Sequence, residues 1–260
     1  MNYITWDINP ILVSLGPLKV HWYGLLFALG FIIGFQIMQW IFQREHKNIE
    51  DLDKLLWFLL IGVIVGARLA HVIFYDPSYY FANPIKILTI WEGGLASHGG
   101  AIGAMIGLYL FKRNKEYSYL WLLDRLAIPT ALLATFIRTG NLFNSEIVGI
   151  PTTVPWAVIF QRVDALPRHP AQVYEALCYL FIFIVLFWLY KTTKIKDKAG
   201  MLFGLLLSFV FIARLLIEFV KSKQEAYNSE LWLNTGQILS IPFILIGLLL
   251  IILAIRKKVK

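Results

Sequence analysis

The chain has 260 residues, of which 58% carry hydrophobic side chains and 15% are charged. Soluble globular domains are about half apolar and about a quarter charged, so this composition excludes a typical water-soluble monomer and a disordered chain. The single cysteine, Cys178, excludes an internal disulfide framework and a multi-thiolate zinc site. The formal net charge of +8 indicates an anionic partner or a membrane topology, depending on where the basic residues lie.

Apolar stretches that are long enough to cross a bilayer recur along the whole chain. Crossing about 30 Å of hydrocarbon takes roughly 20 helical residues. Seven segments meet this length, and the glycine-rich third is the least apolar: 20–42, 54–75, 94–111, 119–138, 171–190, 199–219 and 235–255. The sequence therefore predicts an all-α integral membrane protein with seven transmembrane helices.

The basic residues between these segments predict their orientation, because short cytoplasmic connections carry the excess of Lys and Arg. With the N-terminus outside, the inner connections hold 14 basic residues: Arg44, Lys47, Lys54, Lys112, Arg113, Lys115, Lys191, Lys194, Lys196, Lys198, Arg256, Lys257, Lys258 and Lys260. The outer connections hold six: Lys19, Lys86, Arg162, Arg168, Lys221 and Lys223. We therefore expect the N-terminus outside and the C-terminus in the cytoplasm. Because most of the basic charge sets topology, we expect no nucleic-acid partner.

The longest connection, about 139–170, faces outside in this topology and contains four prolines. Loops of this length are usually functional, and short extended pieces such as 156–160 are expected in it. The sequence shows no internal repeat and no sizeable soluble domain. We therefore expect residues 1–260 to form a single membrane-embedded domain with one outer-side loop region.

Polar side chains gather at the outer ends of several predicted helices. An ionisable group at membrane depth costs roughly 2.5–3.5 kcal/mol, so each one indicates function. Arginine offers fixed, paired donors to phosphate oxygens, so the set suits a lipid phosphate headgroup. Two alternatives stay open: Arg214 and Glu218 lie four apart and could neutralise each other, and Arg68 with His71 could anchor at the interface. The set comprises His21, Tyr23, Arg68, His71, His98, Arg138 and Arg214.

The third predicted helix begins with a histidine and a glycine stripe. His98 precedes Gly99 and Gly100, where missing side chains leave room for a substrate, and an imidazole suits a general base near neutral pH. A structural, hydrogen-bonded histidine is the alternative. Gly103 and Gly107 continue the stripe at a spacing of four, which favours close helix packing.

The fourth predicted helix ends in a polar run that reads Arg138-Thr-Gly-Asn141-Leu-Phe-Asn144-Ser-Glu146, with Gly149 three residues further on. We expect Gly140 to end the helix and the polar side chains after it to point toward the outer pocket. A plain helix cap with a polar loop is the alternative. A second polar cluster, from Arg168 to Glu175, opens the fifth helix and exceeds what a helix start needs.

Other chemistries lack the residues they require. The chain has no Walker phosphate loop, no Cys-x-x-Cys pair and no His-Glu-x-x-His motif. We therefore expect no cofactor and no metal site. Cys178 lies in an apolar run without a nearby charge, as is typical of an inert core thiol.

Five motifs in order resemble the bacterial prolipoprotein diacylglyceryl transferases, and the resemblance extends over nearly the whole chain. The most specific is the run from Arg138 to Glu146. Where the family often has a tyrosine one turn before the arginine of the sixth helix, this chain reads Val210-Phe211. The five are His21-Trp-Tyr23-Gly24, Gly93 to Gly103, Arg138 to Glu146, Arg168 to Glu175, and Arg214-Leu-Leu-Ile-Glu218-Phe.

The resemblance implies transfer of a diacylglyceryl group from phosphatidylglycerol to the lipobox cysteine of exported prolipoproteins, with release of glycerol 1-phosphate. It places the site toward the outer leaflet of the bacterial cytoplasmic membrane, in a multi-pass protein. The implied catalytic residues are His98, as the candidate base, with Tyr23, Asn141, Glu146, Arg214 and Glu218. The implied substrate-binding residues are Arg138, Arg214, His21, Gly99, Gly100, Asn144 and Gly149.

The residues favour one mechanism for such a transfer. Arg138 and Arg214 hold the phosphate, while Glu146 and Glu218 orient the arginines. An anionic-phospholipid transporter or flippase is the alternative function, but paired halves with broken helices, which transport favours, are not evident. A non-catalytic membrane scaffold does not explain the polar convergence.

Overall fold

The computed structural model describes residues 3–16, 18–113, 115–222 and 233–256. Four of the basic residues used to predict topology, Lys223, Lys257, Lys258 and Lys260, lie outside the described residues. The chain divides into two compact units. Unit 1 comprises Met1–Met38 and Leu123–Lys260, and unit 2 comprises Gln39–Leu122.

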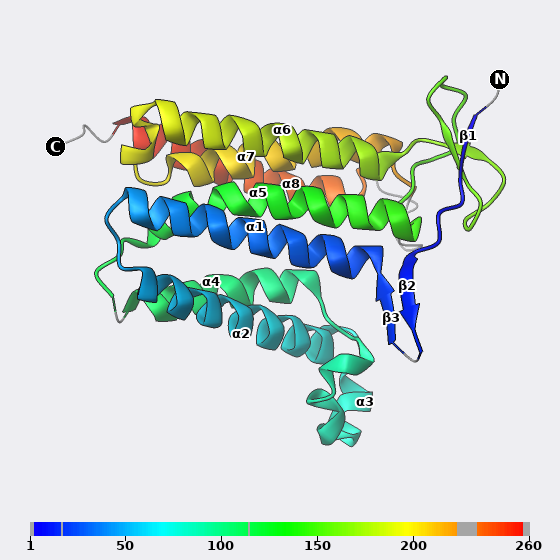
Figure 1. Cartoon of the computed structure of the whole chain (residues 1–260), viewed down its shortest axis with the longest axis horizontal. Coiled ribbons are helices and arrows are strands. Elements are labelled where there is room, and N and C mark those ends of the chain that lie inside the picture. Colours follow the sequence, from blue (N-terminus) through cyan, green and yellow to red (C-terminus); the bar gives the residue numbers. More distant parts are fainter. Residues whose placement is uncertain (1–2, 17, 114, 223–232, 257–260) are drawn as a thin grey trace. The chain divides into compact units, whose positions relative to one another are not determined.

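Each of the seven predicted spans is a helix in the part of the chain that the structure describes (Figure 1). Six of these helices are long and apolar enough to cross a membrane, so the chain is a mostly helical, multi-pass membrane protein. The exception is α4, whose 17 residues extend about 25 Å at 1.5 Å per residue. The helices are α1 (Trp22–Arg44), α2 (Ile49–Phe74), α4 (Ser97–Arg113), α5 (Tyr119–Asn144), α6 (Ala171–Thr192), α7 (Met201–Ile217) and α8 (Thr235–Arg256).

The prediction of an all-α fold is incomplete, because short strands lie outside the long helices. In one sheet, β1 (Ile4–Trp6) pairs in parallel with β4 (Val158–Phe160), which pairs antiparallel with β5 (Pro167–Arg168). A separate hairpin joins β2 (Ile11–Leu15) and β3 (Leu18–His21). The extended piece expected within 156–160 is confirmed as β4. Short helical segments complete the fold: α3 (Pro77–Ala82), η1 (Pro84–Ile87), η2 (Ile90–Glu92), η3 (Lys194–Asp197) and η4 (Glu218–Val220).

Unit 2 is built on the close contact between α2 and α4, which lie side by side in Figure 1. A Cβ added at Gly103 would lie 1.9 Å from the carbonyl oxygen of Gly62, and one at Gly107 would lie 2.3 Å from that of Phe58. Only glycine permits backbones to approach this closely. The packing role predicted for Gly103 and Gly107 is confirmed.

In unit 1, a buried carboxylate joins α5 to the start of α7. The Asp124 side chain is fully buried and accepts hydrogen bonds from the backbone nitrogens of Gly200, at 2.7 Å, and Phe203, at 2.9 Å. The first amides of a helix have no partner within the helix, so a carboxylate from elsewhere can cap them. Asp124 therefore fixes the start of α7.

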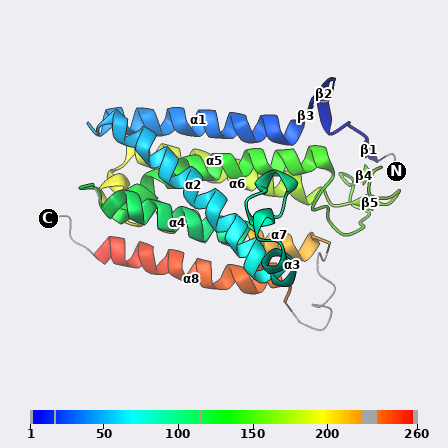
Figure 2. The same ribbon diagram turned by 90° about the horizontal axis from the view of Figure 1, so that it is seen from below.

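The three-stranded sheet lies at the end of unit 1 where α5 ends and α6 begins (Figure 2). Two arginines bind it to its surroundings. Arg162 donates to the backbone oxygens of Ile8 and Phe143, both at 2.6 Å, and Arg168 pairs with Asp164. These contacts hold the segment after α5 against the N-terminal strand and so position the polar residues that follow α5.

Candidate functional site

The helix α5 continues past Gly140 to Asn144, so the prediction that Gly140 ends the helix is wrong. Gly140 instead packs against Tyr23: an added Cβ would lie 2.7 Å from the Tyr23 ring. The chain turns immediately after the helix, where Ser145 has a φ of 55°. This turn brings Glu146 back onto the last turn of α5, and its backbone nitrogen donates to the carbonyl oxygen of Asn141 at 3.0 Å.

Arg138 is the start of a continuous polar network at the end of α5. Its Nε lies 2.9 Å from Oε2 of Glu175, and its Nη1 donates to Oδ1 of Asn141 at 3.2 Å. The Asn141 amide then donates to Oε2 of Glu146 at 2.9 Å, and the Asn144 amide donates to Oε1 at 3.2 Å. The sequence-based hypothesis made Glu146 the carboxylate that orients Arg138. In the structure Glu175 makes the direct ion pair, and Glu146 is linked to Arg138 through Asn141.

Glu175 extends the network to the end of α7. It is fully buried, and its Oε1 lies 3.2 Å from Nζ of Lys221, which is also buried. The same Nζ lies 3.3 Å from Oε2 of Glu218. Lys221 is a site residue that the sequence analysis missed and read only as an outer loop charge. Its place three residues after Glu218, as an i, i+3 pair, was the signal that could have found it.

The start of α6 supplies more polar contacts than a helix start needs, as the polar cluster from Arg168 to Glu175 predicted. Besides Glu175, Gln172 is fully buried and donates to the backbone oxygen of Glu146 at 2.6 Å. Tyr179, one turn after Glu175, is also buried and interacts electrostatically with both Arg138 and Arg214. The face of α6 that begins at Gln172 therefore supports the polar run of α5.

Arg214 and Glu218 do not serve simply to neutralise each other. Glu218 pairs with Lys221, and its carboxylate lies against the start of α8, where a Cβ added at Gly236 would be 2.6 Å from it. The Nε of Arg214 is buried without a hydrogen-bond partner among the described residues. A buried donor without a partner is costly, so this N–H group of Arg214 is available to an anionic ligand.

Tyr23 and His21 occupy different environments at the start of α1. Tyr23 is half-buried, and its ring lies against Gly140, the residue before Asn141 in α5. His21 is exposed on β3, where its backbone pairs with Ile11. The structure therefore brings Tyr23 to the polar network and leaves His21 at the hairpin.

Gly149 lies where three backbone segments meet. An added Cβ would lie 2.5 Å from Cβ of His169 and 2.6 Å from the carbonyl oxygen of Val220. The Gly149 oxygen accepts hydrogen bonds from Arg168, at 3.0 Å, and Ser222, at 2.9 Å. Close packing explains why this position is a glycine. Its role in substrate binding stays a prediction.

In unit 2, His98 is exposed in the first turn of α4. The room expected beside Gly99 is taken by α2, because an added Cβ would lie 2.2 Å from Cβ of Ala70 and 2.3 Å from the oxygen of Gly66. Gly100 is also buried and faces α2 at ordinary contact distances. The two glycines therefore pack helices here, and their contact with substrate stays a prediction.

The polar network in unit 1 has the chemistry of an anion site. It joins two cationic side chains to three carboxylates, and Arg214 lies one turn before Glu218 at the end of α7. No group of His, Cys, Asp and Glu that could hold a metal ion exists among the residues described. A network of this kind can bind and orient a phosphate through its guanidinium groups. The linked charged residues are Arg138, Lys221, Glu146, Glu175 and Glu218.

Comparison with known proteins shows the family of the chain. The family model for prolipoprotein diacylglyceryl transferase matches residues 10–253. The phosphatidylglycerol–prolipoprotein diacylglyceryl transferase of Tolumonas auensis is 54% identical over 98% of this chain and 99% of its own length. Enzymes of the same name from Chloroherpeton thalassium and Porphyromonas gingivalis are 47% and 46% identical, over 98% and 99% of this chain and 96% of their own lengths. The chain therefore belongs to the prolipoprotein diacylglyceryl transferase family.

Proposed function

We propose that this protein transfers the diacylglyceryl group of phosphatidylglycerol to the lipobox cysteine of prolipoprotein signal peptides. Relatives with this activity in their name match it over nearly its whole length. The observation that carries the proposal at the level of residues is the network around Arg138, in which a guanidinium is held by Glu175 and Asn141. Such an arginine is suited to a phosphate ester.

The transfer replaces one bond at a saturated carbon. The cysteine sulfur attacks the glyceryl carbon that carries the phosphate, a carbon–sulfur bond forms, and the carbon–oxygen bond to phosphate breaks. The electron pair leaves with the phosphate oxygen as glycerol 1-phosphate. Arg138 and Arg214 bind the phosphate and stabilise the negative charge that grows on it, which is the largest electrostatic contribution expected in such a site.

The thiol must lose its proton before or during the attack, because the thiolate is the nucleophile. His98 accepts this proton, and its exposed imidazole is accessible for that role. Asn141 and Tyr23 donate hydrogen bonds to the lipid headgroup. Glu218 keeps Lys221 in place, and Glu175 orients Arg138. The resemblance implies substrate contacts for His21, Gly99, Gly100, Asn144 and Gly149, and these contacts are part of the proposal.

The chain spans the bacterial cytoplasmic membrane seven times, with the N-terminus outside and the C-terminus in the cytoplasm. The excess of basic residues in the inner connections supports this orientation. Residues 1–260 act as one membrane-embedded transferase domain with an outer-side loop region at about 139–170. The active site faces the outer leaflet, where exported prolipoproteins and phosphatidylglycerol meet.

Purified protein in vesicles that contain phosphatidylglycerol, incubated with a synthetic lipobox peptide, tests this function. We expect the peptide cysteine to gain the mass of a diacylglyceryl group and glycerol phosphate to be released. A peptide in which serine replaces the lipobox cysteine is the matched control and gains no mass. Intact lipid binding and lipid movement between leaflets without any peptide product would contradict a transferase and support a lipid transporter.

A further inference from the structure

Arg68 in α2 is buried, with 4% of its surface exposed, and the transfer reaction as proposed does not use it. A guanidinium has five N–H groups, and the Arg68 side chain makes five hydrogen bonds to backbone oxygens. The side chain therefore has no N–H group left for a lipid phosphate, although sequence reasoning placed it in the phosphate pocket. The accepting oxygens are those of Ile87 at 2.9 Å, Gly93 at 2.6 Å, Gly94 at 3.0 Å, Thr89 at 3.4 Å and Lys86.

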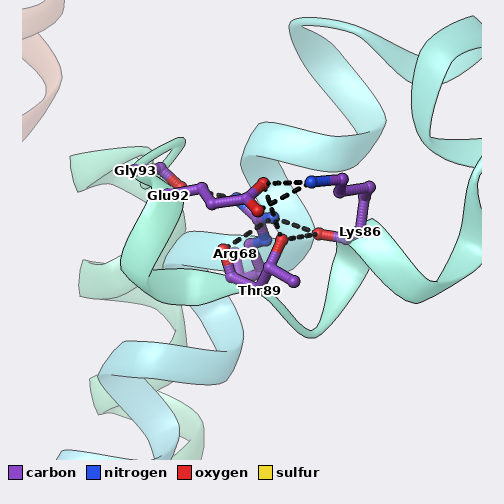
Figure 3. A network of polar contacts seen from close by, with 5 residues as sticks. All are labelled: Arg68, Lys86, Thr89, Glu92 and Gly93. Carbon is purple, nitrogen blue, oxygen red and sulfur yellow. Dashed lines mark hydrogen bonds and ion pairs between the residues drawn. The ribbon is translucent and has the colours of Figure 1, made fainter.

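The loop that supplies these oxygens wraps around the guanidinium (Figure 3). Three large apolar side chains in or next to it are exposed: Ile85, Leu88 and Trp91 are 79%, 74% and 77% exposed. A side-chain ion pair, with Nζ of Lys86 2.7 Å from Oε1 of Glu92, closes the loop on its outer side. Because the loop has no apolar core of its own, its conformation depends on Arg68.

The glycine pair after η2 directs two backbone carbonyl oxygens toward Arg68. Gly93 and Gly94 have φ angles of 91° and 72°, a left-handed conformation that glycine adopts without strain. A Cβ at Gly94 would lie 2.7 Å from Nη1 of Arg68 and 2.7 Å from the His71 ring. Two consecutive carbonyl oxygens thus reach one nitrogen of Arg68, and no side chain fits at the second position.

The loop that contacts Arg68 continues directly into the start of α4. Two residues after Gly94, the backbone nitrogen of Ala96 donates to the oxygen of Ala67 in α2 at 3.0 Å. The helix begins at Ser97, and His98 is its second residue. Gly99 and the glycines after it pack α4 against α2, and the loop that Arg68 organises enters the helix just before His98.

We propose that Arg68 is a positioning residue that fixes the loop of residues 86–94 and, through it, the place of His98. The inference rests on the proposed function, in which His98 accepts the thiol proton. Lysine at position 68 keeps the charge but offers three N–H groups from one atom, which cannot reach carbonyl oxygens spread from Lys86 to Gly94.

A kinetic cycle tests whether Arg68 acts through His98. Transfer rates are measured for wild type, R68K, H98Q and R68K/H98Q, with R113K, at an exposed residue in the last turn of α4, as the matched control. We expect R68K to lower kcat about 100-fold, as a misplaced catalytic group does, with KM for phosphatidylglycerol within about twofold of wild type. The double variant should be no slower than H98Q, because both changes remove one function.

Each other result of this cycle contradicts the proposal. Wild-type kcat in R68K shows that the loop does not need the arginine. Losses that multiply in the double variant show that Arg68 acts independently of His98. Wild-type activity in H98Q removes the step that Arg68 is inferred to support. G94A provides a second route: it opens the loop while Arg68 stays, so it should reproduce the kinetics of R68K and add nothing to it.

A measurement that does not need activity separates this inference from the proposed function. We expect a lysine-specific protease to cleave R68Q after Lys86 about tenfold faster than wild type, because the loop opens more often, while R113Q is cleaved at the wild-type rate. Equal cleavage of R68Q and wild type would overturn the role of Arg68. If wild type makes no lipidated peptide but R68Q shows the faster cleavage, the proposed function fails and the loop-holding role stands.

Discussion

Glu175 is the residue on which the charge balance of the polar network depends most. It is fully buried and lies between two cationic side chains, with Arg138 at 2.9 Å from one carboxylate oxygen and Lys221 at 3.2 Å from the other. A buried carboxylate is tolerated only when it is paired, so its presence here requires both partners. Glu175 therefore fixes the direction in which Arg138 presents its remaining N–H groups.

Replacing Glu175 with glutamine tests this role. The amide keeps the shape but leaves Arg138 without its ion pair and Lys221 with Glu218 alone, so we expect the free energy of unfolding to fall by about 3 kcal/mol. We also expect KM for phosphatidylglycerol to rise about tenfold, because Arg138 loses its orientation. E116Q, at an exposed glutamate, is the control for the loss of one negative charge. An E175Q variant with wild-type KM would show that Arg138 needs no such partner.

At the scale of elements, Asp124 connects two helices that are far apart in the sequence. It caps the first turn of α7 from within α5 by accepting from two backbone nitrogens. D124A should therefore lower the free energy of unfolding by about 2 kcal/mol, the upper range for a lost helix cap, and D124N should lower it less, since its amide oxygen still accepts. Thermal unfolding in detergent measures both, with D53A, at an exposed aspartate of α2, as the control. A D124A midpoint equal to that of D53A would contradict the capping role.

The segment after α5 that carries β4 and β5 contains an ion pair whose effect on stability depends on pH with a predictable sign. The Arg168 guanidinium holds the pKa of the Asp164 carboxyl below its usual value. A lowered pKa in the folded state adds stability above the ordinary aspartate value, about 3.9, and this stability is lost as pH falls through the lowered pKa. The difference in thermal midpoint between wild type and D164N should be present at pH 6 and shrink toward pH 3. A difference that grows as pH falls would contradict this assignment.

The elements that sequence reasoning predicted best are those with a simple physical requirement. All seven predicted helices exist within the described residues, because a long apolar stretch has few other options in a bilayer. The predicted end of α5 was wrong by one turn, because Gly140 is needed for contact with Tyr23 and does not end the helix. The parallel pairing of β1 with β4 joins residues about 150 positions apart, which no local pattern shows.

In the candidate site too, the contacts that could be predicted from the sequence join residues that are close together in it. Arg138, Asn141, Asn144 and Glu146 are close in sequence, and the structure links them by hydrogen bonds. Partners from other helices were harder to predict, because helix packing decides which face of α6 meets α5. Arg68 shows the limit most clearly: its charge suggested a phosphate ligand, whereas its five N–H groups are all used by its own loop. Charge can be read from sequence, but the number of free donors cannot.

For the whole molecule, the topology is a prediction that labelling can test. In a C178S background, a cysteine placed at the exposed Val163 should react with a membrane-impermeant maleimide on intact cells. One placed at the exposed Lys194 should react only after the membrane is opened. The opposite pattern would place the outer-side loop region in the cytoplasm and contradict a site that faces the outer leaflet.

The central claim is that the Arg138 network carries out diacylglyceryl transfer, and the R138A variant in the vesicle assay tests it most directly. Mass spectrometry of the lipobox peptide gives the initial rate, with R113A, at the exposed end of α4, as the matched loss of one arginine. We predict that R113A lipidates the peptide at the wild-type rate and that R138A is slower by about 100- to 1,000-fold, the scale of one lost charge-stabilising group. Equal rates in R138A and wild type would contradict the account.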